Sequence, residues 1–297
     1  MKIGICLRKS AYLPEAYAYT DFLNSHGFKV ELGFEDELSL NLDLKLKFLG
    51  FSFPLPSKLI KSRMPEIHEY GSLSIPPFAK VKDIFKRTIN TKPVGRIFLN
   101  NVVKQNLNFL DNKPFIFRDM GIDSSFFKQK IEKPEYDVIY CGGEREGLLN
   151  AIKKLNYINL KVLIVGDFSN SFRSNFPDKR TTAFTGRMNR KHLPELYQSC
   201  RFGLNFTPDI YPFNIQTSTK TLEYCAAGLG IISNRYHWVE EFMSSRNGNF
   251  SWIDQILSRK NIENFNFITP DVSDLEWNIV LEKSSIKTFV ESFSTIY

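Results

Sequence analysis

The sequence predicts an α/β protein with two domains, each built around a parallel sheet. A strand–helix–strand pattern opens the chain, and strands alternate with helices of about ten residues again after residue 136. The 297 residues suffice for two domains of ordinary size. Residues 119–135 have little periodicity and are typical of a linker. We therefore expect an N-terminal domain at 1–118, a C-terminal domain at 136–272 and a final helix at 273–297.

The N-terminal half begins with a strand at residues 2–7, a helix at 14–26 and a strand at 28–34. The helix has a proline near its start and a glycine directly after its end, which is the usual asymmetry of helix termini. Residues 42–48 then alternate leucine or phenylalanine with charged residues, and Phe51, Phe53 and Leu55 repeat the pattern. This alternation favours strands, with an amphipathic membrane-binding segment as the alternative.

The remaining elements are assigned from the same periodicities. In the N-terminal half we expect loop and short helix at 57–77, a helix at 78–89, a strand or strand-to-helix passage at 96–102 and a strand at 114–118. In the C-terminal half the predicted strands are 136–141, 160–165, 182–185, 202–206 and 230–233. The predicted helices are 144–155, 192–200, 218–227, 236–244 and about 274–293. Such alternation is typical of βαβ units.

Positive charge is concentrated in the N-terminal half. Residues 44–104 contain twelve Lys or Arg and three Asp or Glu, a net charge of +9, whereas the whole chain carries +7. This surplus predicts an anionic partner, which is a membrane surface, a phosphate-bearing acceptor or nucleic acid. An ordinary solvated surface is the alternative. No recognition helix, zinc module or RNA-binding aromatic signature is present, which argues against nucleic acid.

The sequence contains no segment typical of membrane insertion or export. No run approaches the roughly 18 apolar residues that a spanning helix needs, and Arg8 ends a first apolar stretch too short for a signal peptide. The four cysteines, Cys6, Cys141, Cys200 and Cys225, have neither CxxC spacing nor a histidine at metal-ligand spacing. We therefore expect a cytoplasmic protein with reduced, structural cysteines and no metal site.

Glycine-containing turns follow two strands of the C-terminal half. In a parallel sheet, ligands bind outside the carboxyl ends of the strands. Gly142 and Gly143 let the backbone approach an anion at a helix start, and Arg145 is close enough in sequence to reach the same charge. Gly166 ends the next apolar strand. An ordinary tight turn between strand and helix is the alternative for both glycine turns.

The most specific pattern lies in residues 216–233, where a hydroxyl-rich loop leads into a helix that feeds a strand. Amides of the first helical turn, around Ser218 and Thr219, are free to hold phosphates. Lys220 and Glu223 lie three residues apart on one helix face. Lys220 would thus supply a cation to a diphosphate, and Glu223 beside it would supply a carboxylate to ribose hydroxyls. The alternative is a surface Lys–Glu pair.

Several stretches occur in the order found in one family of enzymes. They are residues 119–123 with Phe126, 140–143, 162–166, 184–186 followed by 193–197, and 220–233. Together they resemble the glycosyltransferase group 1 proteins, family 4, of bacterial capsule, O-antigen and exopolysaccharide synthesis. The resemblance covers residues 119–245 of the chain.

The resemblance implies the GT-B fold, which has two Rossmann-like domains facing each other across a cleft and a C-terminal helix that crosses back to the N-terminal domain. The N-terminal domain would bind the acceptor and the C-terminal domain the nucleotide sugar. Glu223 then corresponds to the carboxylate that binds the donor ribose, and Arg145 is the nearest match to the basic residues that contact the diphosphate. Arg187 and Met188 correspond to the backbone that meets the base.

One position departs from the family pattern. The family often carries a second Glu eight residues before the first, in contact with the donor sugar. Ile215 occupies that position here, so that Asp209 or Gln216 would have to replace the missing carboxylate.

The implied reaction moves a hexose-type sugar from a nucleoside-diphosphate sugar to a glycan or lipid-linked acceptor in bacterial surface polysaccharide synthesis, lipopolysaccharide included. The resemblance implies retention of configuration and no cofactor or metal, and no DxD motif is present. An inverting enzyme would need a base from the N-terminal half, for which we expect Glu15, ahead of Asp21 and His26. The enzyme would be cytoplasmic, with the inner face of the cell membrane as a docking surface. The alternatives are a nucleotide-sugar epimerase of the same architecture and a basic nucleic-acid-binding protein.

Overall fold

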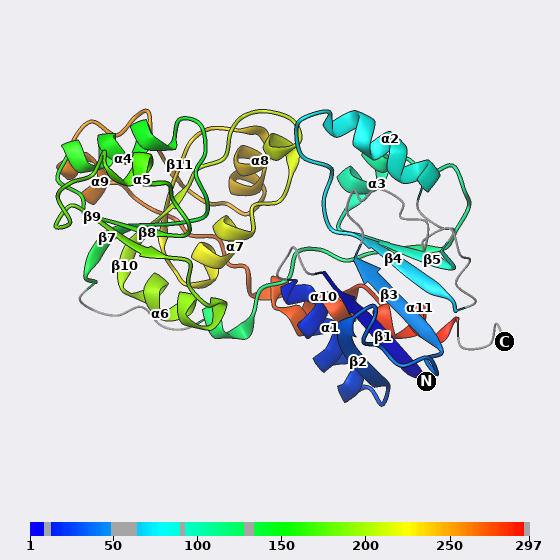
Figure 1. Ribbon diagram of the computed structural model, residues 1–297. Helices are drawn as coiled ribbons and strands as arrows, with labels where there is room; N and C mark the ends of the chain where they lie inside the picture. Colours follow the sequence, from blue (N-terminus) through cyan, green and yellow to red (C-terminus); the bar gives the residue numbers. More distant parts are fainter. Residues whose placement is uncertain (9–12, 49–63, 90–92, 128–133, 294–297) are drawn as a thin grey trace. The chain divides into compact units, whose positions relative to one another are not determined.

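The computed structural model describes residues 1–8, 13–48, 64–89, 93–127 and 134–293 (Figure 1). The chain separates into two compact units: Met1–Gly121 with Leu275–Tyr297 form unit 1, and Ile122–Asp274 form unit 2. Each unit contains one six-stranded sheet, and all pairings between its strands are parallel. The two predicted Rossmann-like domains are therefore present, and the C-terminal segment belongs to the N-terminal unit, as expected.

The sheet of unit 1 has the strand order β2-β1-β3-β4-β5-β6. Its strands are β1 (Lys2–Leu7), β2 (Lys29–Phe34), β3 (Leu44–Phe48), β4 (Glu66–Tyr70), β5 (Gly95–Phe98) and β6 (Phe115–Phe117). Its helices are α1 (Pro14–Ser25), α2 (Ala79–Ile89) and α3 (Asn101–Leu107), followed by α10 and α11 from the chain's end. Helices α2 and α3 lie on one face of the sheet, and α1 and α10 lie on the other (Figure 1).

The position of strand β3 distinguishes the two interpretations of residues 42–48, a strand of the sheet and a membrane-binding segment. Leu44 and Leu46 are fully buried, and Leu42 and Phe48 are buried too. The strand lies inside the sheet, between β1 and β4. The segment is therefore a core strand and not a membrane-binding element; the repeat of the pattern at Phe51, Phe53 and Leu55 lies outside the described residues.

Strand β4 occupies a stretch that we expected to be loop and short helix. All five of its residues, Glu66–Tyr70, are buried although three of them are Glu or His. The Glu66 carboxylate contacts Lys47 Nζ at 2.8 Å and His68 Nε2 at 3.3 Å. Burial of this charge is tolerated because both oxygens have cationic or polar partners.

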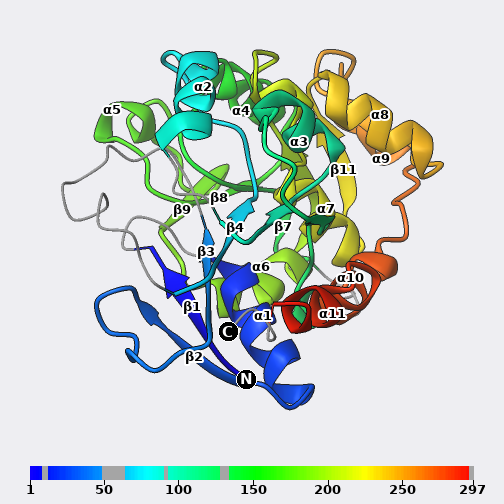
Figure 2. The same ribbon diagram turned by 90° about the vertical axis from the view of Figure 1, so that its right-hand side faces the viewer.

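The predicted final helix is two short helices, α10 (Trp277–Lys283) and α11 (Ile286–Glu291), separated where Ser285 has a φ of 56°. α10 packs against α1, and the two views of the ribbon agree on this (Figures 1 and 2). The rings of Phe289 and Phe293 press on Gly95 of β5, where an added Cβ would lie 2.7 Å from each. The C-terminal segment therefore completes the core of unit 1.

The sheet of unit 2 has the strand order β12-β11-β10-β7-β8-β9. Its strands are β7 (Tyr136–Cys141), β8 (Val162–Val165), β9 (Thr182–Gly186), β10 (Cys200–Asn205), β11 (Gly230–Ser233) and β12 (Ser251–Trp252). Its helices are α4 (Leu148–Tyr157), α5 (Asn170–Arg173), α6 (Leu193–Gln198), α7 (Thr219–Ala226), α8 (His237–Ser245) and α9 (Arg259–Glu263). The strand order reverses between β7 and β10, and ligands of such sheets bind at the carboxyl ends of the strands at that point.

Predictions from the sequence also concern cysteines, membrane-spanning helices and metal sites, and the described residues give these findings. All four cysteines are free. No described helix has the length and apolarity to cross a bilayer. Within the described ranges, no group of three or more His, Cys, Asp or Glu side chains is placed to hold a metal ion. Part of the predicted linker, residues 128–133, lies outside the described residues.

Candidate functional site

The loops at the carboxyl edge of the unit 2 sheet are held together by backbone contacts between glycines. The amide of Gly142 donates to Val165 O at 2.9 Å, and the amide of Gly166 donates to Gly186 O at 2.9 Å. Gly166 has a φ of +143°, and a Cβ there would lie 2.0 Å from Gly142 O. Gly166 is therefore required for loop packing, whereas a Cβ on Gly143 would meet nothing within 4 Å. Among the predicted glycines Gly142, Gly143 and Gly166, it is Gly143 that has open space beside its backbone.

A polar network fixes the start of α7 at the end of β10. Ser218 is the N-cap: its Oγ accepts from the amide of Thr221 at 3.3 Å and donates to Asn205 Oδ1 at 3.1 Å. Asn205, the last residue of β10, donates in turn to Ser233 Oγ and Tyr236 Oη, both at 2.9 Å. The first turn of the helix therefore stands at the reversal of strand order, where its leading amides have no acceptor within the helix.

The predicted cation Arg145 reaches the same place from the loop after β7. Its Nη1 is 3.5 Å from Thr207 Oγ1, just beyond the end of β10, and its guanidinium lies 5.9 Å from the centre of the Phe213 ring. Arg145 is exposed. Because α4 begins at Leu148 and not at the predicted residue 144, Arg145 lies in a loop and is not part of the helix.

Glu223 is fully buried and sits among three donors. Tyr197 Oη donates to Oε2 at 2.9 Å, and Lys220 Nζ lies 2.7 Å from the same oxygen. Arg190 Nη2 lies 2.5 Å from Oε1, an ion pair without the alignment of a hydrogen bond. Burial acts to raise the pKa of the Glu223 carboxyl, but Lys220 and Arg190 outweigh it and the pKa is lowered. The carboxyl group is therefore an anion held in place at neutral pH.

The exposure of the partners distinguishes this cluster from an ordinary surface pair. The Lys220 side chain is 31% exposed and that of Arg190 is 18% exposed, whereas Glu223 is not exposed at all. The alternative of a surface Lys–Glu pair is therefore excluded. The sequence does not predict Arg190 and Tyr197 as site residues. They come from the loop after β9 and from α6, and no spacing in the sequence connects them with Glu223.

Other predicted donor residues are not joined to this cluster. Arg187 is exposed and Met188 is half-buried, in the loop after β9. Neither makes a hydrogen bond or ion pair with Arg145 or Glu223 in the described part of the chain. Asp209 accepts from Asn214 Nδ2 at 3.1 Å and so has a local partner. The Nε2 atom of Gln216 is buried and has no partner among the described residues.

Glu15 lines a cavity of about 120 Å³ in unit 1. The wall of this cavity is formed by residues at the carboxyl ends of β1, β3, β4 and β6, namely Arg8, Leu13, Phe48, Glu69, Gly71, Ser72, Arg118 and Met120. Asp21 and His26 are not among the described lining residues, and His26 lies at the far end of α1, 3.2 Å from Glu282. Of the three bases considered, Glu15 is thus the one placed at this edge of the sheet.

The same cavity wall contains a buried ion pair that was not predicted. Glu69 and Arg118 have 0% and 1% of their side chains exposed and contact each other through Oε1 and Nη2. Arg118 also donates to Tyr19 Oη at 3.2 Å, and its guanidinium lies 5.2 Å from the centre of the Trp277 ring. Glu69 Oε2 is buried without a partner in the described chain.

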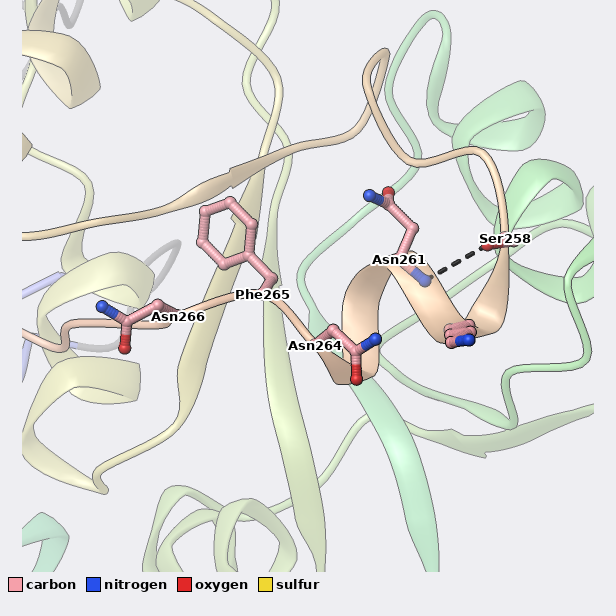
Figure 3. A pocket seen from close by; sticks show the side chains of 6 residues that line it. Ser258, Asn261, Asn264, Phe265 and Asn266 are labelled. Carbon is pink, nitrogen blue, oxygen red and sulfur yellow. Dashed lines mark hydrogen bonds between the residues drawn. The ribbon is translucent and has the colours of Figure 1, made fainter.

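A larger, open depression of about 490 Å³ lies around α9 and is lined by Ser258, Lys260, Asn261, Asn264, Phe265 and Asn266 (Figure 3). Arg259 of α9 pairs with Asp137, near the first residue of β7, at 3.1 Å. The depression is therefore at the amino edge of the sheet, opposite to Arg145 and the start of α7. Its position separates it from the predicted donor site.

The whole chain is similar in structure to solved proteins that include a glycosyltransferase and an epimerase. A glycosyltransferase from Rickettsia africae ESF-5 has a TM-score of 0.63 and 12% identity, with 100% of this chain and 99% of that chain covered. Anabaena HepE in complex with UDP-glucose has a TM-score of 0.59 and 11% identity, with 99% and 98% covered. The UDP-GlcNAc 2-epimerase from Methanocaldococcus jannaschii has a TM-score of 0.56 and 10% identity, with 97% and 100% covered.

No protein-family model matches the sequence, and no curated protein matches it. At identities of 10–12% the structural likeness shows the fold alone. The fold is the one that the sequence predicted: two Rossmann-like domains of the GT-B class, with the C-terminal segment returned to the first.

Proposed function

We propose that the chain is a glycosyltransferase whose donor is a nucleoside-diphosphate sugar, bound at the carboxyl edge of unit 2. The observation that carries this proposal is the cluster of Glu223, Lys220 and Arg190 beside the first turn of α7. First-turn amides and a neighbouring ammonium suit a diphosphate. A buried, ionised carboxylate suits ribose hydroxyls as donors. The likeness in fold to a structure with UDP-glucose bound supports the same assignment.

Donor binding would proceed by an exchange of partners. In the unliganded site, Lys220 Nζ contacts Glu223 Oε2 at 2.7 Å while its side chain remains partly exposed. A diphosphate at the first turn of α7 would attract the ammonium and leave Oε2 open to a ribose hydroxyl. Arg190 and Tyr197 would keep the carboxylate in position during the exchange.

The remaining roles follow from position around α7. Arg145 would supply a second cation to the diphosphate from the loop after β7. The backbone at Arg187 and Met188 would meet the base. Gln216, whose Nε2 lacks a partner in the described structure, would contact the sugar in place of the carboxylate that the family carries.

The reaction would depend on charge stabilisation at the leaving group. Negative charge develops on the nucleoside diphosphate as the glycosidic bond breaks, and a helix N-terminus with Lys220 and Arg145 would offset it without a metal. We propose retention of configuration and a glycan or lipid-linked acceptor of bacterial surface polysaccharide. The cavity lined by Glu15 would take the acceptor end, and Glu15 would act as a base only in an inverting reaction.

A nucleotide-sugar epimerase is the second candidate, because the fold is also similar to that of a UDP-GlcNAc 2-epimerase. Such an enzyme would release an isomerised sugar nucleotide and need no acceptor. The nucleic-acid alternative has no comparable support. Three cations of the basic segment are used internally, since Lys47 pairs with Glu66, Lys86 with Asp83, and Arg96 with Asp111.

The two candidate enzymes differ in their products. The purified protein is incubated in EDTA with a panel of UDP-, GDP- and TDP-sugars, with and without lipid-linked acceptor. Release of nucleoside diphosphate that increases with acceptor supports the transferase, and NMR of the product gives its anomeric configuration. An isomerised sugar nucleotide without release supports the epimerase. Neither product, together with no nucleoside-diphosphate binding by calorimetry, would contradict both.

A further inference from the structure

Helix α2 has one Asp–Lys pair turned inward and three apolar residues turned outward. Asp83 and Lys86 are 2% and 3% exposed, and Asp83 Oδ1 lies 3.0 Å from Lys86 Nζ. Val81, Ile84 and Phe85 are instead 47%, 54% and 49% exposed. These three positions follow the i, i+3, i+4 rule and share one helix face. A helix that only covered the sheet would have the opposite arrangement.

The inward charges are stabilised locally, so the arrangement is part of the fold. Asp83 Oδ1 also accepts from the amide of Ser74 at 3.0 Å. Burial lowers the pKa of Lys86, and Asp83 acts against that shift. Ala79, one turn before Asp83, is buried on the same side. The buried face of α2 therefore carries small or polar side chains, and Val81, Ile84 and Phe85 do not enter the core.

Two more large apolar side chains directly before the helix are exposed. Ile75 is 57% exposed and Phe78 is 77% exposed. We call Ile75, Phe78, Val81, Ile84 and Phe85 the apolar face of α2. Five large apolar side chains within eleven residues are far more than the single exposed hydrophobics that soluble surfaces commonly carry.

Positive charge borders this face on both sides. At 100° per residue, Lys80 and Lys82 fall on opposite flanks of the line through Val81, Ile84 and Phe85. Lys80 is exposed, and Lys82 Nζ donates to Ile75 O at 3.0 Å. The one acidic residue between positions 75 and 87 is Asp83, which is buried against Lys86. The border is thus basic without an exposed acid.

We propose that the apolar face of α2 docks on an anionic lipid bilayer. An exposed apolar stripe flanked by lysines is the arrangement by which a helix lies in the interface between headgroups and acyl chains. Lysines at that depth are attracted by anionic lipids. A helix face is convex and a fluid surface accommodates it, whereas a protein partner would have to supply a matching groove. This proposal is independent of the donor site, and it replaces residues 42–48, which are buried, as the membrane-binding element.

The test is co-sedimentation of the full chain with vesicles. Vesicles of phosphatidylcholine mixed with phosphatidylglycerol are compared with vesicles of phosphatidylcholine alone, at low and high salt. We expect binding to the anionic vesicles, weakened by salt. The double variant Val81→Gln/Ile84→Gln should bind at least about tenfold more weakly, and Lys80→Gln about fivefold more weakly. Leu40→Gln, which changes a 97% exposed apolar side chain elsewhere in unit 1, should bind like the parent.

Three results would overturn the proposal. One is binding that is equal for the double variant and Leu40→Gln. Another is no binding to anionic vesicles at low salt. The third is self-association in light scattering that disappears in the double variant, because the face would then be a contact between copies of the chain. Should the double variant fail to fold, judged by circular dichroism, Phe78→Gln takes its place, since that side chain precedes the helix and is 77% exposed.

Discussion

Both units place a carboxylate and a cation at the carboxyl edge of a parallel sheet, but the two clusters differ in access to solvent. In unit 1, Glu69 and Arg118 are both buried. In unit 2, Glu223 is buried while its partner Lys220 is 31% exposed. Neither member of the Glu69–Arg118 pair has a side chain exposed to solvent, so neither is free to turn toward a ligand as a partly exposed cation is. A pair with one partly exposed member is able to exchange that member for a ligand, so we propose a structural role for Glu69–Arg118 and a binding role for Lys220–Glu223.

Removing the cation of the closed pair should have the largest effect on stability. Arg118→Ala leaves Glu69 as an uncompensated buried charge, and we expect a loss of about 3–5 kcal/mol in the free energy of unfolding. Lys220→Ala leaves Glu223 with Arg190 and Tyr197, and should cost about 1 kcal/mol or less. Urea unfolding measures both. Equal losses in the two variants would remove the distinction between the clusters.

The backbone of the unit 2 edge should be the next most sensitive feature. Gly166→Ala places a Cβ 2.0 Å from Gly142 O and imposes a strained φ, so we expect a loss of about 2 kcal/mol or more. Gly143→Ala is the matched control, because its Cβ would meet nothing within 4 Å. Thermal unfolding of the two variants gives the comparison. A Gly166→Ala protein as stable as Gly143→Ala would mean that the loops do not pack as described.

The open cluster should be sensitive in binding. Lys220→Ala and Glu223→Gln are each expected to weaken nucleoside-diphosphate binding by about 1–3 kcal/mol, the range for hydrogen bonds to charged groups. Calorimetry in EDTA measures the affinity and tests metal independence at the same time. Lys260→Ala, in the depression on the opposite edge, is the matched control and should bind like the parent. A loss in Lys260→Ala alone would move the site to that depression.

The acid response of unit 1 should be confined to low pH. Burial acts to raise the pKa of Glu66, but hydrogen bonds from His68 and Lys47 outweigh it and bring the pKa down to about 2 from 4.5. A carboxyl with a depressed folded pKa contributes stability above its unfolded pKa and loses it as pH falls. Stability should therefore decline between pH 4.5 and about 2. Glu66→Gln should flatten this part of the curve in acid-unfolding experiments, and an unchanged slope would contradict the assignment.

Sequence reasoning was most successful where apolar periodicity and burial coincide. Residues 2–7 and 162–165 are apolar runs, and both are buried strands. Strand β4 was missed because Glu66, His68 and Glu69 break the apolar pattern, and only their tertiary partners make their burial tolerable. Local pattern alone does not contain that information.

The candidate site could be predicted only in part, because the sequence pattern again contains local information alone. Lys220 and Glu223 are three residues apart on one helix, so their contact follows from helix geometry. Arg190 reaches Glu223 from an element 33 positions earlier, and Arg118 reaches Glu69 across 49 positions. These contacts depend on the packing of whole elements, which a single sequence does not specify.

The return of the C-terminal segment to unit 1 has a consequence for synthesis on the ribosome. Unit 2, Ile122–Asp274, is continuous in sequence, and all of its residues have been joined before Leu275 is added. Unit 1 waits for the last residues, because Trp277 covers Gly121, and Phe289 covers Gly95. The N-terminal part of unit 1 is thus synthesised first, but its core is completed last. During elongation, chaperones would have to shield the apolar residues of unit 1 that the C-terminal segment later covers.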